Sequence, residues 1–195
     1  MITVGVDAGD VERRLAAGRL RCPGCSATLT GWGHARRRML RGPEGPLWTR
    51  PRRSRCIGCG VTHVLLPVVA LLRRADAAVV IGAALAAKAA GLGHRWIAAV
   101  LSRPAETVRG WLRRFAGRLE SVRAVFTVWL RALDPDPVMP SSAGSAWVDA
   151  VTAIDAVTVS VMRRFVVTVS PWGVAAVVSG GRLLAPGWPD LAAVC

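Results

Sequence analysis

The sequence has no tyrosine, three histidines and a single lysine, Lys88, so arginine carries nearly all of its positive charge. Acidic residues are also scarce: 12 Asp and Glu stand against 26 Lys and Arg, and the formal net charge at pH 7 is +14. Guanidinium groups match phosphate oxygens in pairs, so this imbalance favours a polyanionic partner. The alternative is that the arginines only keep an apolar chain in solution.

Long hydrophobic runs are missing as well. The best candidates for a membrane span are residues 61–72, which contain His63 and Pro67, and residues 77–87, which are followed by Lys88 and are too short. The first residues do not combine a basic start with an apolar stretch, as a secretory signal would. We therefore expect no membrane association and a cytoplasmic location, with the basic charge placing the protein on the nucleoid.

Four of the five cysteines form two C-x-x-C pairs. The pairs are Cys22 with Cys25 and Cys56 with Cys59. One tight turn presents both thiolates of such a pair to one ion, and two turns complete the tetrahedral site that Zn²⁺ usually occupies. A redox dithiol is the alternative, but it needs no second pair. We predict a structural zinc ion in a small β ribbon. His34 and His63 could substitute as ligands, but we expect them beside the site or facing phosphate, and we assign no role to Cys195.

Arginines crowd the segment between the two cysteine pairs, in residues 34–42 and 50–55, with Trp32 and Trp48 among them. A small ribbon cannot bury so many arginines, so they face solvent or a ligand, and nucleic-acid phosphate is the favoured ligand. The residues that we expect to hold phosphate here are Arg36, Arg37, Arg38, Arg52 and Arg53. A solvated surface is the alternative.

Residues 94–115 predict two short helices joined by a tight turn. Apolar residues follow helical spacing on both sides of the segment "SRP", which interrupts the pattern before Ala105. This is the arrangement of a helix-turn-helix, whose second helix enters the major groove of DNA. Ser102 stands where such turns usually carry glycine. An ordinary helical hairpin within a core is the alternative.

The outward face of the second helix carries the predicted DNA contacts. Arg109 is the expected base reader, because arginine paired with guanine is the commonest specific contact, and Arg113 also faces the bases. Glu106 is a secondary candidate, whereas Arg103, Thr107 and Arg114 are placed for phosphates. The whole predicted set in these helices is Arg103, Ala105, Glu106, Thr107, Arg109, Gly110, Arg113 and Arg114.

Apolar residues continue from Val108 to Leu133 in alternating steps of four and three. This heptad pattern predicts that the second helix extends past Phe115, and it allows a homodimer through the helix over 108–133. The stripe is widened by Val125 and Leu130, and paired opposite charges are missing beside it, which favours a core within one chain.

The remainder of the chain shows no catalytic constellation. Its carboxylates stand alone or in a linker rich in Pro, Ser and Asp at 134–145, whereas a transposase nuclease needs three acidic residues around two metal ions. Ser170 and Pro171 predict the cap and first residue of a short helix, while residues 157–161 allow either helix or strand. We therefore predict no enzymatic activity and no small-molecule substrate.

These patterns predict a mainly α fold with a small β zinc ribbon, a central helix-turn-helix and a small C-terminal helical region. Charge follows the same division, because the net charge is +10 over residues 1–75 and −2 over residues 134–195. The predicted parts are a zinc ribbon with an N-terminal helix over 1–72, the helix-turn-helix and extended helix over 73–133, the linker over 134–145 and the helical region over 146–195.

The stretch "RCPGC…RPRRSRCIGCGVTHVLLP", followed by the predicted helix-turn-helix, resembles the N-terminal DNA-binding region of zinc-ribbon insertion-sequence transposases. The chain also resembles an actinobacterial family of stand-alone proteins that combine both modules. The resemblance covers about residues 1–133, and it implies zinc on the four paired cysteines and duplex DNA bound through Arg109 and its neighbours.

We therefore expect a zinc-stabilised DNA-binding protein without catalysis of its own, either a transcriptional regulator or a transposase-derived protein. One alternative is the DNA-binding fragment of a transposase whose nuclease half is encoded separately. Another is a zinc-ribbon adaptor that binds RNA or protein.

Overall fold

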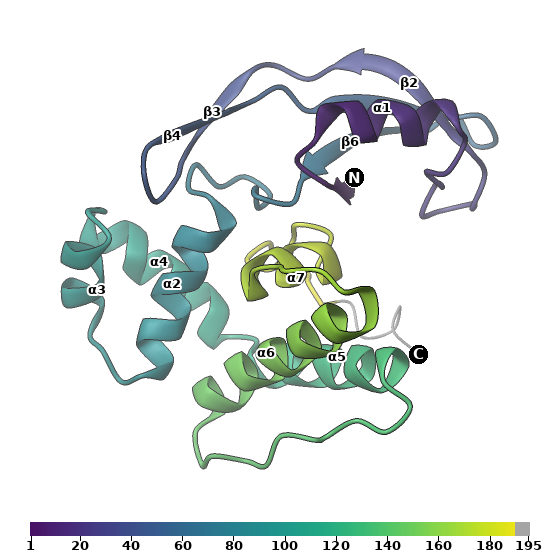
Figure 1. Cartoon of the computed structure of the whole chain (residues 1–195). Helices are drawn as coiled ribbons and strands as arrows, with labels where there is room; N and C mark the ends of the chain where they lie inside the picture. The colour runs from purple at the N-terminus through teal and green to yellow at the C-terminus, as the bar shows by residue number, and fades with distance from the viewer. Residues whose placement is uncertain (190–195) are drawn as a thin grey trace.

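The computed structural model describes residues 1–189, in which a β-rich half lies across a helical half (Figure 1). The β-rich half consists of β1 (Ile2–Val4), α1 (Ala8–Ala16), β2 (Leu29–His34), β3 (Arg38–Arg41), β4 (Pro46–Thr49), β5 (Arg52–Cys56) and β6 (Thr62–Pro67). The helical half consists of α2 (Ala78–Ala89), α3 (His94–Val100), α4 (Ala105–Ala116), α5 (Leu119–Leu133), α6 (Ala146–Phe165) and α7 (Pro171–Val178). With seven helices and six strands in the described residues, the fold is mixed α/β.

Four strands form one sheet in the order β1-β6-β5-β2, and β3 pairs with β4 in a separate hairpin. The ribbon strands β2, β5 and β6 are antiparallel, whereas β1 pairs in parallel with β6. Helix α1 packs on this sheet, because its buried residues Val11 and Leu15 join Leu29 and Leu65 in one hydrophobic cluster. The side chain of Asp7 caps α1 by accepting a hydrogen bond from the Gly9 N–H at 2.8 Å.

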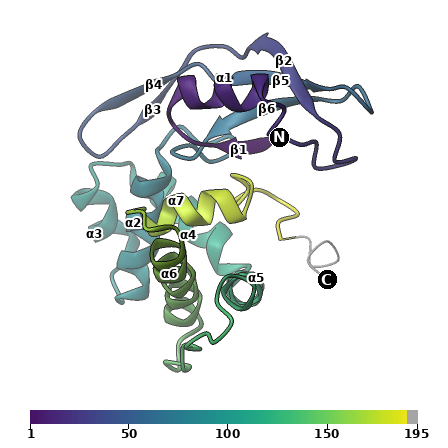
Figure 2. The same ribbon diagram turned by 45° about the vertical axis from the view of Figure 1, so that its right-hand side comes forward.

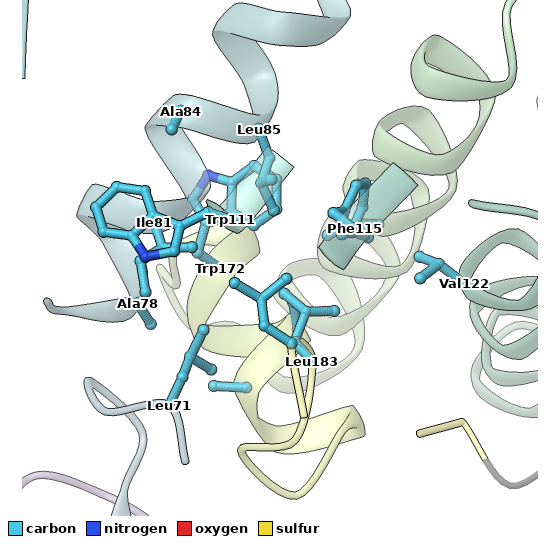
Figure 3. Close-up of a cluster of buried hydrophobic side chains, with 14 of the residues drawn as sticks. Leu71, Ala78, Ile81, Ala84, Leu85, Trp111, Phe115, Val122, Trp172 and Leu183 are labelled. Carbon is cyan, nitrogen blue, oxygen red and sulfur yellow. The ribbon is translucent and has the colours of Figure 1, made fainter. Parts of the chain in front are cut away.

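A second core joins all the helices from α2 to α7, and Figure 3 shows members of it from α2, α4, α5 and α7. Its aromatic members Trp111 and Phe115 come from α4 and Phe126 from α5, and all three are buried. Trp172 of α7 reaches the same core and lies against α2, where Gly82 leaves room for the indole ring. The helical half is therefore held by burial of large apolar side chains from different helices.

Gly82→Ala is expected to destabilise the protein, because an added Cβ would lie 1.9 Å from Cδ2 of Trp172 and force the ring aside. Overpacking of this kind costs about 1–3 kcal/mol of unfolding free energy. Gly173→Ala is the matched control, since its Cβ would meet only Val68 at 3.7 Å. Urea denaturation of both variants checks this expectation, which equal stabilities would contradict.

The predicted continuous helix over 108–133 is wrong. Helix α4 ends at Ala116, α5 begins at Leu119, and Arg118 between them has φ −147°. The Arg118 guanidinium donates hydrogen bonds to the carbonyl oxygens of Leu183 and Ala185, which holds the chain in this break. The heptad pattern does not reveal the break, because the alternating steps of four and three between apolar residues continue without interruption from α4 into α5.

The apolar stripe of α5 is part of the core, as its breadth predicted. Val122, Val125 and Phe126 are buried, and α5 packs along α6. Most of this stripe is therefore covered within the chain, although Trp129 keeps 42% of its surface exposed, and the break at Arg118 rules out only a dimer that needs one continuous helix over 108–133.

The C-terminal part is helical, as expected. Residues 157–161 belong to α6, so their alternation does not produce a strand, and Val157 is buried against the helical core. Ser170 caps α7 by accepting a hydrogen bond from the Trp172 N–H at 3.3 Å, and Pro171 is the first helical residue. Both predictions for this helix start are confirmed.

The first strand and the last helix meet at the junction between the two halves (Figure 2). The hydroxyl of Thr3 in β1 donates a hydrogen bond to the carbonyl oxygen of Ala176 in α7 at 3.3 Å. After α7, the carbonyl oxygen of Gly181 accepts a hydrogen bond from the Leu72 N–H at 2.7 Å. Segments far apart in the sequence therefore close the contact between the β-rich and helical halves.

Candidate metal centre and basic surfaces

Two turns of matching shape carry the four paired cysteines. In the first turn the Ser26 N–H donates to the carbonyl oxygen of Cys22 at 2.8 Å, and in the second the Gly60 N–H donates to that of Cys56 at 3.1 Å. Ser26 and Gly60 both have left-handed backbones, with φ of 58° and 72°. Each turn therefore curls back directly after its second cysteine and leaves both sulfurs on one side.

The four sulfur atoms meet in one cluster and form no disulfide. They all lie within 4.8 Å of one another, with 3.8 Å between Cys22 and Cys59 and 3.3 Å between Cys25 and Cys56. Four thiolates about 2.3 Å from one tetrahedral ion lie roughly 3.8 Å apart. The sulfur geometry therefore fits a four-coordinate metal ion, as the two C-x-x-C pairs predicted.

The two turns pack closely enough to require glycine between the second pair of cysteines. A Cβ at Gly58 would lie 2.8 Å from Cβ of Ala27 and 3.6 Å from Sγ of Cys25. A side chain at this position would push the turns apart and separate the sulfurs.

Protons and metal compete for these sulfurs. The Cys59 N–H points at Sγ of Cys56 and is the main reason that the pKa of the Cys56 thiol falls to about 6. The Val61 N–H lowers the pKa of the Cys59 thiol in the same way. Hydrogen bonds with the neighbouring thiols outweigh it and raise the pKa of Cys59 to about 11. One sulfur is thus ready to bind as a thiolate, while another needs a cation to displace its proton.

The two histidines near the cysteines differ in place. His63 is buried, and its Nε2 lies 3.5 Å from Sγ of Cys22, so it borders the sulfur cluster. Burial lowers the pKa of His63. His34 is exposed at the far end of β2, since Leu29 pairs with Cys56 at the start of this strand. Of the two, only His63 contacts a cysteine of the cluster.

The ribbon arginines divide into exposed and structural side chains. Arg36 and Arg37 are exposed, and the Arg37 guanidinium stacks 4.4 Å from the centre of the Trp48 ring. In contrast, Arg38 donates to the carbonyl oxygen of Arg74. Both Arg38 and Arg53, which lies within β5, are half-buried.

Arg52, another predicted phosphate contact, is occupied within the protein. Its Nε lies 2.6 Å from Oε1 of Glu12 in α1, and its Nη1 donates to the carbonyl oxygen of Gly33. The sequence-based set also missed Arg55, which is exposed and lies 4.9 Å from the centre of the exposed Trp32 ring. The sequence offered one signal for Arg55, because it ends the arginine-rich stretch 50–55 directly before Cys56.

Helices α3 and α4 are joined by a turn of four residues in which Ser102 has a left-handed backbone, with φ of 52°. Glycine is the usual residue in this conformation, so the serine fills the expected position with some strain. The inner face of α4 is buried, whereas Arg109, Arg113 and Arg114 are exposed on the outer face.

The outer face of α4 has few internal contacts. Arg109 lies 3.4 Å from Glu106 in an exposed pair, and Arg114 bends back to the carbonyl oxygen of Gly110. Ala105, Thr107 and Gly110 are half-buried. Exposed pairs of this kind contribute little, so Arg109 can exchange Glu106 for a ligand.

Arg103 has a structural role in place of the predicted phosphate contact. Its Nε lies 2.6 Å from Oδ1 of buried Asp76, and its Nη2 donates to the carbonyl oxygen of Gly42. Asp76 also pairs with Arg41 at 2.6 Å through Oδ2. The side chain of Arg103 is only 13% exposed. Its contacts connect the β3–β4 hairpin and the α3–α4 turn to Asp76, shortly before α2, so its charge is not available to phosphate.

Within residues 1–189, none of the helices is both long and apolar enough to cross a membrane. Comparisons of the chain with family models, with curated proteins and with solved structures found no match.

Proposed function

We propose that the protein binds duplex DNA without catalysis, as a transcriptional regulator or a transposase-derived DNA-binding protein, and that zinc holds its ribbon. The observation that carries the proposal is the two-sided helix α4, which buries Val108, Trp111 and Phe115 while it exposes Arg109 and Arg113. Paired with α3 through a short turn, such a helix has the form that enters a major groove.

The exposed arginines of the ribbon support the same proposal. No ion pair within the described residues involves Arg36, Arg37 or Arg55, so their charge is available to phosphate. Stacking on Trp48 and Trp32 orders two of these guanidiniums and reduces the entropy lost when they bind. Arginines held in this way suit contacts to the DNA backbone, which position a protein without reading sequence.

The ribbon arginines and the outer face of α4 are connected in a way that favours their binding to the same DNA duplex. Figure 1 shows the β3–β4 hairpin close to α3 and α4, and the hydrogen bond of 3.1 Å from Arg103 to Gly42 joins the hairpin to the α3–α4 turn. The shared carboxylate of Asp76 is nearly inaccessible to solvent. Phosphate contacts of the ribbon can therefore set the orientation of α4.

Zinc is the proposed ion because four cysteine sulfurs at tetrahedral spacing form a soft ligand set that suits it. No open position is left for a substrate in a Cys₄ site, so its role is structural.

Arg109→Ala and Arg37→Ala are expected to weaken DNA binding in different ways. Loss of a base contact at Arg109 costs about 1–3 kcal/mol on the preferred sequence and relaxes the preference at one base pair. Loss of a phosphate contact at Arg37 weakens all duplexes alike and lowers the logarithmic salt slope by about one. The preferred site is first selected from random duplexes, and Kd is then measured over a salt series.

Arg131→Ala is the matched control, since it removes one exposed arginine from the end of α5. Its affinity and salt slope should remain those of the wild type. Uniform weakening by Arg109→Ala would show that α4 does not read bases, and unchanged affinity in both test variants would reject the proposed surface. Preference for an RNA hairpin over every duplex would favour the adaptor alternative.

A further inference from the structure

A cavity of about 690 Å³ follows α7, and residues of β1, α1, β4, α2, α5 and α6 and of the segment after β6 complete its wall. Figure 2 shows α7 between β1 and the pair α5 and α6, where the two halves of the chain meet. Small-molecule sites have volumes of about 300–1,000 Å³, so this cavity can hold a whole ligand.

The wall of the cavity is mostly hydrocarbon. Val157 and Val174 belong to its buried part, and the side chains of Trp129, Phe165 and Val177 line it although each is at least 42% exposed to solvent. Apolar surface of this kind gains free energy when an apolar ligand covers it.

The two hydroxyls in the wall each make a hydrogen bond within the chain. Thr3 donates to the carbonyl oxygen of Ala176, and Ser170 accepts from the Trp172 N–H. The lining residues include no Cys, His, Asp, Glu or Lys within the described chain. The cavity thus offers space and apolar contact but no pair of groups for acid–base chemistry.

Arg14 of α1 is the one charged residue among these lining residues. None of the ion pairs found in residues 1–189 involves Arg14, whereas the adjacent Arg13 pairs with Asp7 and Asp10. With no acidic residue in the wall, the Arg14 guanidinium leaves an uncompensated positive charge beside an apolar volume. A carboxylate is the ligand group that matches such a guanidinium, through charge-assisted hydrogen bonds.

We propose that this cavity binds an elongated apolar carboxylate, with its hydrocarbon chain along α7 and its head group on Arg14. The ligand is bound and not converted. This site is separate from the metal centre and from the outer face of α4, and its occupancy does not depend on DNA binding.

Decanoate, with 1-decanol as its uncharged counterpart, tests the proposal by calorimetric titration of the full chain. Decanoate should bind saturably with one molecule per chain, and 1-decanol about tenfold more weakly, which is the ratio expected for one charge-assisted contact of about 1.4 kcal/mol. Arg14→Gln should weaken decanoate binding to the level of 1-decanol. Arg13→Gln, the matched control, should leave decanoate binding unchanged.

Gly173→Leu should weaken the binding of both ligands, because its side chain would occupy part of the cavity. A Cβ at residue 173 would lie 3.7 Å from Val68, in ordinary contact, so the larger side chain can be accommodated there. Val177→Glu provides a second test at an exposed lining residue, where the added carboxylate should repel decanoate. Thermal melting confirms that each variant is folded. Absence of one-to-one binding, equal affinity for 1-decanol, or an unchanged affinity in Arg14→Gln or Val177→Glu would overturn the proposal.

Discussion

Cys56→Ser should abolish the proposed zinc binding and unfold the ribbon while the helical half keeps its structure. The four sulfurs join two turns that are 31 residues apart, and Cys56 also begins the second turn through its carbonyl oxygen. Structural zinc contributes roughly 10–16 kcal/mol of apparent binding free energy in finger peptides. A small ribbon has too little folding free energy of its own to stay folded without this contribution. Hydrogen exchange of the full chain should therefore show rapid exchange in β2, β5 and β6 and continued protection in α4 to α6.

Metal analysis accompanies this measurement, with one zinc per chain expected in the wild type and none in the variant. Cys195→Ser is the matched control, because it changes the one cysteine outside the two C-x-x-C pairs. A strong chelator should reproduce the effect of Cys56→Ser. If the purified wild type holds no stoichiometric metal and its exchange pattern resists the chelator, the zinc proposal is wrong.

Asp76→Ala should be among the most destabilising single substitutions outside the metal centre. The carboxylate is 3% exposed and holds Arg41 and Arg103 at 2.6 Å each, so its removal leaves the two guanidiniums without their shared anion. Loss of one partner from a buried ion pair costs about 3–5 kcal/mol, and because the Arg41 side chain is 39% exposed we expect the lower end, about 3 kcal/mol. Urea denaturation should show this loss as a lower midpoint, together with faster hydrogen exchange at the β3–β4 hairpin.

Glu120→Ala provides the comparison, since it breaks the ion pair of Glu120 with Arg123, in which both side chains are more than half exposed. Such surface pairs contribute about 0–1 kcal/mol, so this variant should unfold near the wild-type midpoint. Similar small losses in both variants would mean that Asp76 does not fasten the hairpin to the helices.

Local patterns in the sequence predicted those features that neighbouring residues determine. Two C-x-x-C pairs specify two tight turns, so the sulfur cluster could be predicted without knowledge of the sheet. The start of α7 was equally accessible, because a serine cap followed by Pro171 acts within one helical turn. The short turn before α4 also follows from a local interruption of the apolar pattern at Ser102.

Features that depend on distant partners were not accessible in this way. Arg103 and Arg109 look alike in sequence, yet one is bound to Asp76 and the other is exposed on α4. The three residues of β1 become a strand because β6 pairs with them, and nothing in so short a segment indicates that pairing. The cavity along α7 is equally hidden, since its wall combines residues from Thr3 to Val178.

The contact between Thr3 and Ala176 also has a consequence for the order in which the chain is assembled during synthesis. Residues 1–67 contain the ribbon, both cysteine pairs and the hairpin, so the four sulfurs can come together while α2 to α7 are still being made. The contact of β1 with α7 cannot form until residues 171–178 leave the ribosome, and the Leu72–Gly181 bond follows. Domains generally fold as units from the N-terminus during translation. The ribbon is then already folded when α7 docks against β1.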